Sequence, residues 1–408
     1  MTVSRTTAVP QDEYARGDGL LSKDGRRLFP IGCYELPAED AELKRMAEAG
    51  INLVRCGGVA DLDRVHALGM LGWIPLPLHE GPTEDLRRAV EAAKDHPALA
   101  VWEGPDEIVW NFTAWSGLEE KVGIRSSEWW EQSARAVEYA ETQARRIMPN
   151  LRDAIRLIRE LDDQHHQVWI NEAMHSDAKF VRQYLDHIDI TGCDDYPVNK
   201  AERNISRLGS TTEVWKKIGR GKPVWMVLQA FSWSALGRDG DESVPAYPSF
   251  AESRLMAYDV LAHGAKGILY WGSGYTAPDP AFRDSVYAVT SELAALQPFL
   301  AAPEEGGPAV GLIADDDEPQ NKGVSITARR NDKEWLIALV NEDDHRHMGV
   351  EVSGLDAVNG LLLDLLYGAE TVTVEDGGFI TRMQPHEVKV FATGREWEAA
   401  PRRGRDFH

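Results

Sequence analysis

The sequence predicts an α/β protein, a TIM (β/α)8 barrel followed by a small all-β sandwich domain. The chain has 408 residues, which exceeds the size of one typical domain. Between residues 28 and 302, short apolar runs alternate with stretches of helical hydrophobic spacing, as expected for a parallel barrel of about 250 residues. After residue 302 only short β-branched runs follow. A doubly wound sheet is the alternative architecture, but no glycine-rich phosphate turn follows the first strand.

We expect the barrel strands at eight apolar runs, namely Leu28–Tyr34, Ile51–Cys56, Leu71–Leu78, Ala98–Glu103, Gln167–Glu172, Ile188–Cys193, Pro223–Gln229 and Lys266–Trp271. The spacing between them predicts helices that include Ala38–Ala49, Thr83–Lys94, Ser127–Leu161 with a break near Pro149, Phe250–His263 and Ser285–Leu300. Glycines that follow some of these helices, such as Gly50 and Gly264, provide the expected C-terminal stop.

The composition and the hydrophobic pattern of the sequence change near residue 302. Residues 302–308 have the composition of a linker, and the runs 323–330, 334–341, 348–355, 371–375 and 387–393 have the length and composition of strands. We therefore divide the chain into an N-terminal extension (1–27), a barrel (28–302) and a C-terminal β-sandwich (303–408).

Composition excludes several classes of function. The formal net charge is −22 and no basic patch offsets it, which opposes binding to nucleic acid or to anionic lipid. Cys33, Cys56 and Cys193 are widely spaced, so neither a disulfide framework nor a zinc motif is predicted. No long apolar run and no signal peptide are present, so we expect a cytoplasmic protein or a secreted one that has been trimmed. Assembly into a homo-oligomer stays open.

Polar residues cluster where the predicted strands end. In a TIM barrel the active site lies at the carboxyl ends of the strands. The residues at these positions are Glu35, Arg55, His79, Glu80, Asp106, Glu107, Asn171, Glu172, Asp194, Asp195, Gln229 and Trp271. This concentration of carboxylates is the strongest functional signal in the sequence, although Asp and Glu also cap helices in such loops.

Several of these segments resemble β/α-barrel glycoside hydrolases. Residues 101–107, which end in Asp106 and Glu107, resemble their fourth strand, which carries an acid/base Glu. Residues 189–197, with Asp194-Asp195-Tyr196-Pro197, look like their sixth strand end, and residues 262–271 are similar to their eighth strand, whose terminal Trp floors the sugar site. Residues 28–32 and 49–55 look like their first and second strands. The resemblance covers the predicted barrel, and it implies a carbohydrate substrate and an accessory β-sandwich.

The sequence departs from that family at the seventh strand. Retaining members of the large clan place a nucleophilic Glu there, whereas this chain has Gln229, and an amide cannot attack the anomeric carbon as a carboxylate does. The fourth strand also carries Asp-Glu where the clan has Asn-Glu. The resemblance therefore supports a carbohydrate-binding barrel better than it supports the mechanism of that clan.

Glycoside cleavage requires one carboxylic acid to protonate the leaving oxygen and a second carboxylate to attack or to activate water. We expect Glu107 to be the proton donor, kept protonated by like-charge repulsion from Asp106. The structural alternative is that Asp106 caps the next helix and Glu107 pairs with an arginine. Two candidates remain for the second carboxylate. Glu172 on the adjacent strand suits the retaining separation of about 5 Å, and Asp195 suits the inverting separation of roughly 6.5–9.5 Å.

A second set of residues is expected to bind the substrate: Glu35, Arg55, His79, Asp194, Tyr196, Gln229, Trp233 and Trp271. Arg55 could equally bridge to Glu35, and His79 could be purely structural. The loops 111–126 and 231–249 are long for βα connections, so we expect them to shape the site. The sequence has no metal-binding spacing, and we expect neither a metal nor another cofactor.

The functional hypothesis from sequence is a glycoside hydrolase-like enzyme that cleaves an oligo- or polysaccharide by a two-carboxylate acid/base mechanism. A non-hydrolytic carbohydrate-binding barrel is the first alternative, and Gln229 favours it. The second is a sugar lyase or isomerase on the same fold, which would need a base near the ring carbons and commonly a divalent metal.

Overall fold

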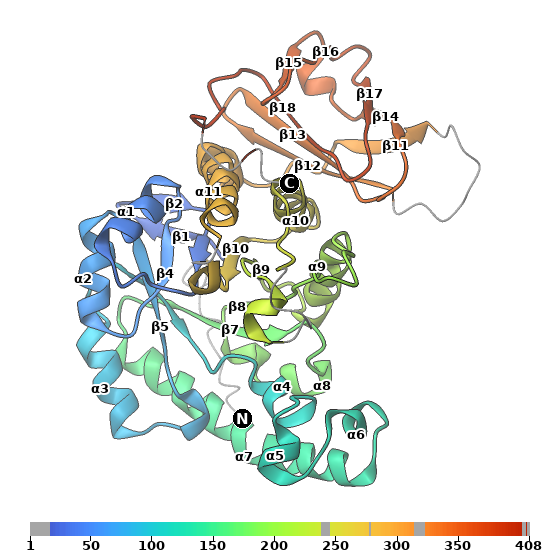
Figure 1. Ribbon diagram of the computed structural model, residues 1–408. Helices are drawn as coiled ribbons and strands as arrows, with labels where there is room; N and C mark the ends of the chain where they lie inside the picture. The colour runs from blue at the N-terminus through green and yellow to red at the C-terminus, as the bar shows by residue number, and fades with distance from the viewer. Residues whose placement is uncertain (1–16, 238–244, 277–278, 314–322, 402–404, 406–408) are drawn as a thin grey trace, which may run out of the picture.

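The computed structural model describes residues 17–237, 245–276, 279–313, 323–401 and 405. Residues 1–16 of the predicted extension and part of the loop 231–249 therefore lie outside the described residues. Figure 1 shows a barrel with its ring of helices and, against helices α10 and α11, a smaller β-rich domain. None of the helices in the described ranges is long and apolar enough to cross a bilayer.

Eight parallel strands form a closed barrel, which confirms the predicted fold. They are β3 (Ile31–Cys33), β4 (Leu53–Arg55), β5 (Leu71–Pro75), β6 (Leu99–Glu103), β7 (Gln167–Ala173), β8 (Ile190–Asp194), β9 (Val224–Gln229) and β10 (Gly267–Trp271). Each overlaps its predicted run. Strand β10 pairs with β3 and closes the barrel, so the carboxyl ends of all eight strands meet at one face.

The helices follow the strands in chain order. The outer helices are α1 (Asp40–Glu48), α2 (Val59–Ala67), α3 (Glu84–Ala93), α7 (Ala134–Leu161), α8 (Ala178–Val181), α9 (Arg207–Ile218), α10 (Phe250–Ala262), α11 (Pro280–Ala295) and α12 (Gln297–Leu300). Local signals fix several starts, since Thr83 caps α3 and a Ser249/Glu252 capping box begins α10. The long connection after β6 forms three short helices, α4 (Ile108–Thr113), α5 (Leu118–Val122) and α6 (Ser126–Trp130).

The predicted break near Pro149 is wrong. Helix α7 is continuous from Ala134 to Leu161 with Pro149 inside it, and it begins seven residues later than predicted. Proline removes one backbone hydrogen bond from a helix. Here Ile147, Met148 and Leu151 are buried on both sides of Pro149, and this packing holds the helix together.

A short hairpin seals the amino-terminal end of the barrel. Strands β1 (Leu21–Lys23) and β2 (Arg26–Leu28) pair antiparallel, and Leu21 packs in one cluster with Trp73, Trp169 and Trp225 of the barrel interior. The indole N–H of Trp225 donates to the carbonyl of Gly19 at 2.9 Å. The last part of the predicted extension thus belongs to the barrel core.

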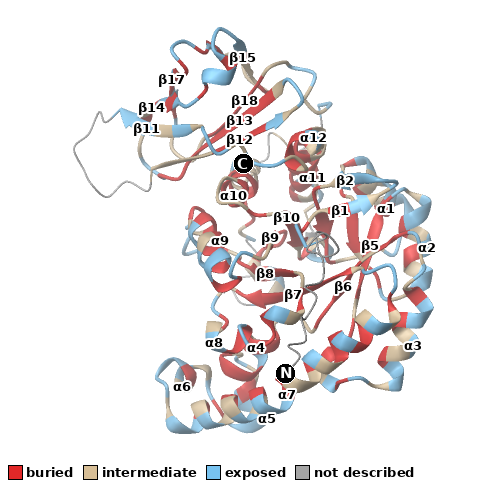
Figure 2. Ribbon diagram, turned by 180° about the vertical axis from the view of Figure 1, so that it is seen from behind, coloured by how far each residue is buried: buried red, intermediate tan, exposed pale blue. Residues whose placement is uncertain are grey.

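The C-terminal domain is a β-sandwich. One sheet contains β11 (Ala309–Ile313), β14 (Met348–Ser353) and β17 (Phe379–Met383), and the other contains β12 (Val324–Asn331), β13 (Glu334–Asn341), β18 (Val388–Ala392), β15 (Leu362–Leu365) and β16 (Thr371–Thr373). Strand β13 is buried on both faces: Ile337 and Leu339 belong to the sandwich core, whereas Leu336 and Ala338 belong to the core shared with the barrel helices. Figure 2 shows β13 and β18 as buried strands above α10.

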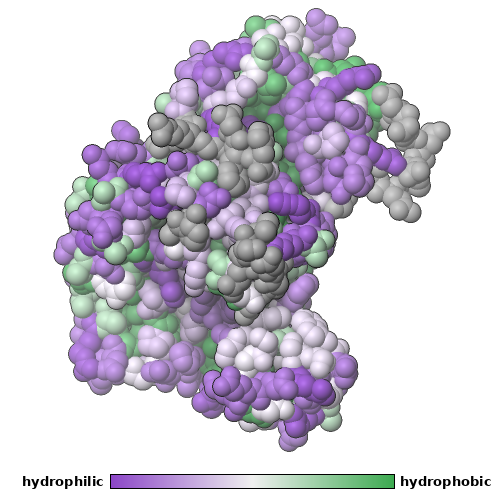
Figure 3. Space-filling model, in the orientation of Figure 1, coloured by the Kyte–Doolittle hydropathy of each residue, from purple (hydrophilic) through white to green (hydrophobic). Residues whose placement is uncertain are grey.

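Polar residues cover much of the face that Figure 3 shows. Figure 3 shows hydrophilic residues over much of the visible face, with apolar residues scattered between them. This distribution agrees with a charge of −22 that is spread along the chain.

Candidate active site

A cavity of about 700 Å³ opens at the carboxyl ends of the barrel strands. This volume lies in the range of small-molecule sites. Strand ends supply Tyr34, Asp106, Glu107, Asn171, Asp194, Asp195 and Trp271, and the segment that forms α4 to α6 supplies Trp110, Trp115, Ser116 and Ser126. The long connection after β6 therefore forms one wall of the cavity, as the sequence predicted for this loop.

The floor of the cavity holds a pair of carboxyl groups. The side chains of Glu107, after β6, and Asp194, at the end of β8, are hydrogen-bonded to each other. Burial raises the pKa of Asp194 well above its usual range, and the nearby charges of Glu107 and Asp106 raise it further. Each carboxyl group of the pair therefore opposes the ionisation of the other.

Asn171 organises these carboxylates. Its Nδ2 donates to Asp194 Oδ2 and to Asp106 Oδ1, both at 2.9 Å. Burial raises the pKa of Asp106, while the hydrogen bond from Asn171 and the charge of Arg55 lower it. A single amide nitrogen thus fixes the positions of two acidic side chains from different strands.

The backbone of Glu107 has an unusual conformation. Its φ is 50°, in the left-handed region that residues other than glycine rarely adopt. Glu107 precedes the first turn of α4, and its backbone N–H donates to the carbonyl of Asn171 at 3.0 Å. Strained backbone of this kind is common at functional sites, where the surrounding structure holds it in place.

Glu172 anchors a helix. Its carboxylate accepts the backbone N–H of Val109 at 3.1 Å, the hydroxyl of Ser176 at 2.7 Å and that of Tyr184 at 2.9 Å. Burial raises its pKa to about 7, and these hydrogen bonds limit the rise. Glu172 is not among the residues that line the cavity, because the alternation along β7 turns Asn171 inward and Glu172 toward α4.

Asp195 lines the cavity but is held by an ion pair. Its Oδ1 accepts Nε and Nη2 of Arg207 at 2.9 and 2.6 Å, and its Oδ2 accepts the hydroxyl of Thr211 at 3.0 Å. Only 1% of its surface is exposed. Both oxygens are therefore engaged by α9.

Four of the expected binding residues, Arg55, Glu35, His79 and Gln229, are not among the residues that line the cavity. Arg55 pairs with the buried Glu103 at 2.7 Å and not with Glu35, and burial raises the pKa of Glu103 to about 7. Glu35 accepts the backbone N–H groups of Gly272 and Ser273 at 2.7 and 3.0 Å, which ties β3 to the loop after β10.

His79 lies in a single 3-10 turn, Leu78–Glu80, whose backbone carbonyl accepts the amide of Asn150 at 3.0 Å. It is not among the lining residues.

Gln229 holds the loop after β8. Its Oε1 accepts the N–H of Val198 at 2.9 Å, and its Nε2 donates to the carbonyls of Val198 and Phe231 at 2.8 and 3.0 Å. The side chain has no exposed surface. A carboxylate could not make the last two bonds, so the geometry explains why glutamine stands at this position.

Aromatic side chains complete the cavity. Tyr196 stacks on Trp271 with ring centroids 5.5 Å apart, and the indole N–H of Trp233 donates to the carbonyl of Tyr196 at 3.3 Å. Trp110 and Trp115 form part of the wall. Sequence reasoning did not single out these two residues, although the length of their loop pointed to the region.

Within the described ranges, one group of His, Asp and Glu side chains is compact enough to hold a metal ion, namely Asp259, His263 and Glu342. None of these residues lines the cavity.

Comparison with known proteins extends to the fold. No family model and no curated protein matches the sequence. A β-galactosidase from Bacillus circulans sp. alkalophilus has 9% sequence identity and a TM-score of 0.53 over 90% of this chain and 99% of its own. An arabinofuranosidase has 12% identity and a TM-score of 0.52 over 92% and 93%.

A β-galactosidase from the psychrophilic Marinomonas ef1 has 15% identity to this chain and a TM-score of 0.45. The match covers 65% of this chain and 60% of the length of that β-galactosidase. The Bacillus circulans β-galactosidase and the arabinofuranosidase match this chain almost from end to end, so these matches include both the barrel and the β-sandwich. The chain shares its fold, a TIM barrel with a β-sandwich, with solved glycoside hydrolases.

Proposed function

We propose that this protein is a glycoside hydrolase that cleaves a glycosidic bond in an oligo- or polysaccharide, with Glu107 as proton donor and Asp194 as the second carboxylate. The observation that carries the proposal is the hydrogen-bonded pair of Glu107 and Asp194 on the floor of an aromatic-lined cavity at the carboxyl ends of the strands. Two neighbouring carboxyl groups, each of which opposes the ionisation of the other, provide the acid and the base that glycoside cleavage needs.

Because burial and the charge of Glu107 raise the pKa of Asp194, the proton of the pair passes from Asp194 to Glu107 as the sugar binds, and Glu107 carries it to the leaving group. Glu107 transfers it to the glycosidic oxygen while the bond between that oxygen and the anomeric carbon breaks. Asp194 is then ionised, and its carboxylate stands next to the electron-deficient anomeric carbon. The hydrogen bond from Asn171 to Asp194 stabilises the ionised form.

The short distance between the two groups favours a retaining mechanism. Retaining enzymes hold their carboxyl groups about 5 Å apart, whereas inverting enzymes need roughly 6.5–9.5 Å to admit a water molecule. Glu107 and Asp194 lie within hydrogen-bonding distance, nearer to the retaining than to the inverting separation, and a bound sugar has to break this hydrogen bond and part the two groups to about 5 Å. Asp194 accordingly forms a bond to the anomeric carbon as the leaving group departs. In the second step, Glu107 takes a proton from water, and the water oxygen displaces Asp194.

Asp194 suits this role better than the two candidates that the sequence favoured. Asp195 is neutralised by Arg207, and Glu172 accepts hydrogen bonds outside the cavity lining. Tyr196, Trp233 and Trp271 provide ring faces on which the apolar face of a sugar can stack.

Hydrolysis of a panel of aryl glycosides and oligosaccharides tests the proposal. Glu107→Gln should lower kcat by a factor of about 100 to 10,000, the usual contribution of general acid catalysis. The exposed Glu119 on α5 provides the matched control, and Glu119→Gln should keep full activity. Full activity of Glu107→Gln would overturn the assignment.

The nucleophile has its own test. Asp194→Gly should be inactive, and added azide should restore cleavage by attacking the anomeric carbon in place of the carboxylate, with a glycosyl azide of inverted configuration as product. Azide should not restore Asp195→Gly. An NMR spectrum of the first wild-type product that shows inverted configuration would contradict the retaining mechanism.

A carbohydrate-binding barrel without hydrolysis is the second candidate. The observation that favours it is Gln229. This residue stands at the end of the seventh strand, where the glycosidase clan has a carboxylate, and its amide N–H groups donate to backbone carbonyls. Calorimetry would support this candidate if the wild-type protein bound an oligosaccharide tightly and left it uncleaved after long incubation.

A further inference from the structure

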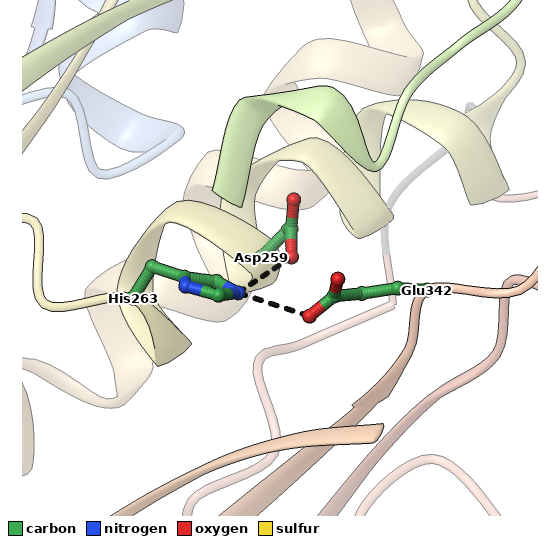
Figure 4. Close-up of side chains that lie close together, drawn as sticks. All are labelled: Asp259, His263 and Glu342. Atoms are coloured by element: carbon green, nitrogen blue, oxygen red, sulfur yellow. Dashed lines mark hydrogen bonds and ion pairs between the residues drawn. The ribbon is translucent and has the colours of Figure 1, made fainter. Parts of the chain in front are cut away.

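The junction between barrel and sandwich contains a compact group of metal-ligating side chains. Asp259 lies on α10 and His263 is the C-cap residue of that helix, so the two side chains, four residues apart, lie on one face. Glu342 comes from the sandwich, directly after β13. Figure 4 shows the three side chains pointing toward one another, with Nε2 of His263 directed at both carboxylates.

The distances within this group are close to those of a metal site. His263 Nε2 lies 2.9 Å from Glu342 Oε1 and 3.7 Å from Asp259 Oδ1. One ligand atom from each residue can be chosen so that all three lie within 4.8 Å of one another. Tetrahedral zinc, with bonds of about 2.0–2.2 Å, places neighbouring ligand atoms about 3.3–3.6 Å apart. Small rotations about side-chain bonds that move the ligand atoms by up to about 1 Å would provide this geometry.

Neighbouring residues orient the ligand atoms. The backbone N–H of Gly209 donates to Asp259 Oδ2 at 2.6 Å, so Oδ1 is the oxygen that faces His263. A Cβ atom at position 209 would lie 2.4 Å from the His263 ring, so glycine makes room for the imidazole. On the other side of the ring, Nδ1 lies 3.6 Å from Glu213 Oε1. A carboxylate at the second nitrogen is the usual partner of a metal-binding histidine.

The charges of the group also favour a divalent cation. Asp259 is fully buried and Glu342 is 7% exposed, while Glu213 has its own cation in Lys216 at 2.9 Å. Two buried carboxylates thus converge on one imidazole. A divalent cation bound by these carboxylates and by neutral His263 brings the net charge to zero, which reduces the cost of burying the acidic pair.

We propose that Asp259, His263 and Glu342 bind a divalent cation of the zinc class, which cross-links α10 of the barrel to the end of β13 in the sandwich. A nitrogen ligand with two carboxylates suits Zn²⁺ better than Mg²⁺ or Ca²⁺, which prefer oxygen ligands alone. Ser325 Oγ, 3.0 Å from His263 Nε2, or a water molecule provides the fourth ligand. The role is structural, and it is independent of the proposed hydrolysis because these residues do not line the cavity.

Zinc titration of the full-length protein tests the proposal. The protein is freed of any histidine tag, treated with a chelator and dialysed, and ZnCl₂ is then titrated in a calorimeter. We expect one saturable site and a higher Tm with zinc, since a ligand that binds only the folded state stabilises it. MgCl₂ should give neither effect. Absence of saturable zinc binding, or equal binding of Mg²⁺, would overturn the proposal.

Two variants and a matched control locate the site. His263→Gln should weaken zinc binding at least about tenfold. Glu342→Gln keeps the shape of its side chain and should abolish the visible absorption of bound Co²⁺, a readout that does not depend on stability. The control is His166→Gln, because His166 pairs with Asp162 at the same four-residue spacing, in the turn between α7 and β7, and lies outside the compact group. If both site variants bound zinc as tightly as the control, the proposal would be overturned. The role of His263 would then be limited to hydrogen bonds with Glu342 and Ser325.

Discussion

Asn171 contacts two acidic side chains of the candidate site through one amide nitrogen, and its removal gives a prediction about pH. The two hydrogen bonds favour the ionised forms of Asp106 and Asp194. Asn171→Ala should therefore raise the pKa of Asp194 further. A group with a higher pKa stays protonated up to a higher pH, and a protonated carboxyl cannot act as nucleophile. The acidic limb of kcat/KM should move upward by about one pH unit, the equivalent of one hydrogen bond.

The control for this profile is Asn150→Ala, which removes an amide whose partner is the carbonyl of His79, outside the cavity lining. Its acidic limb should match that of the wild type. A limb that stays in place in Asn171→Ala, or moves to lower pH, would contradict the role of Asn171 in holding Asp194.

Gln229 provides a second prediction at this scale. Gln229→Glu should lower the free energy of unfolding by about 2–3 kcal/mol, because a buried carboxylate would face the carbonyls of Val198 and Phe231, to which the amide donates. It should not raise activity. Urea denaturation measures the loss, with the exposed Gln183→Glu as control. Unchanged stability together with higher kcat would indicate that strand seven can supply the nucleophile.

The identity of the second carboxylate shows where sequence reasoning stops. Asp194 and Asp195 are adjacent, and the alternation of side chains along a strand means that a shift of one residue exchanges the inward and outward positions. The predicted strand ended at Cys193, whereas β8 ends at Asp194. The sequence placed Asp194 only among the binding residues, and the hydrogen bond to Glu107 became visible only with the strand ends in place.

At the scale of elements, α4 depends on Glu172. Four donors converge on its carboxylate: the backbone N–H groups of Val109 and Trp110 and the hydroxyls of Ser176 and Tyr184. Glu172→Gln would turn an NH₂ group toward some of these donors, so we expect a loss of about 2 kcal/mol in stability. Because α4 begins directly after Glu107, kcat should fall as well.

Urea denaturation and steady-state kinetics of the variant test both effects, with Glu119→Gln as the surface control. A fall in kcat with no loss of stability would argue that Glu172 takes part in the chemistry, as one of the two sequence hypotheses held.

The strands were the most predictable elements, and the long helix was less so. Buried parallel strands appear as compact apolar runs, and each of the eight overlaps its prediction. Pro149 is a local signal for a break, yet packing of the residues on both sides of it overrides that signal in α7. The hairpin β1–β2 was missed because each of its strands has only three residues, too few to show a period.

At the scale of the whole molecule, a buried ion network joins barrel and sandwich. Arg254 on α10 donates to Glu292 on α11 at 2.7 Å and to the carbonyl of Val388 in β18 at 2.8 Å, and Arg405 also pairs with Glu292 at 2.7 Å. Arg254→Met should cost about 3–5 kcal/mol, because it removes one partner of a buried charge. The two domains should also unfold less cooperatively.

Thermal unfolding followed by calorimetry and by tryptophan fluorescence checks this expectation, with the exposed Arg156→Met as control. If the variant keeps a single transition at the wild-type Tm, the network does not contribute to the junction. Contacts of this kind have no signature in hydrophobic periodicity, which is why the sequence predicted the two domains but not how they are joined.

The hairpin β1–β2 at the amino-terminal end of the barrel also has a consequence for folding during synthesis. Gly19, whose carbonyl accepts the indole of Trp225, precedes its partner by 206 residues. At a synthesis rate of about 5–20 residues per second, roughly 10–40 s pass between the emergence of the two. During that interval Leu21 lacks part of the apolar environment that later buries it. Leu21 therefore stays incompletely buried until the seventh barrel strand, β9, has been synthesised and Trp225 joins the cluster around it.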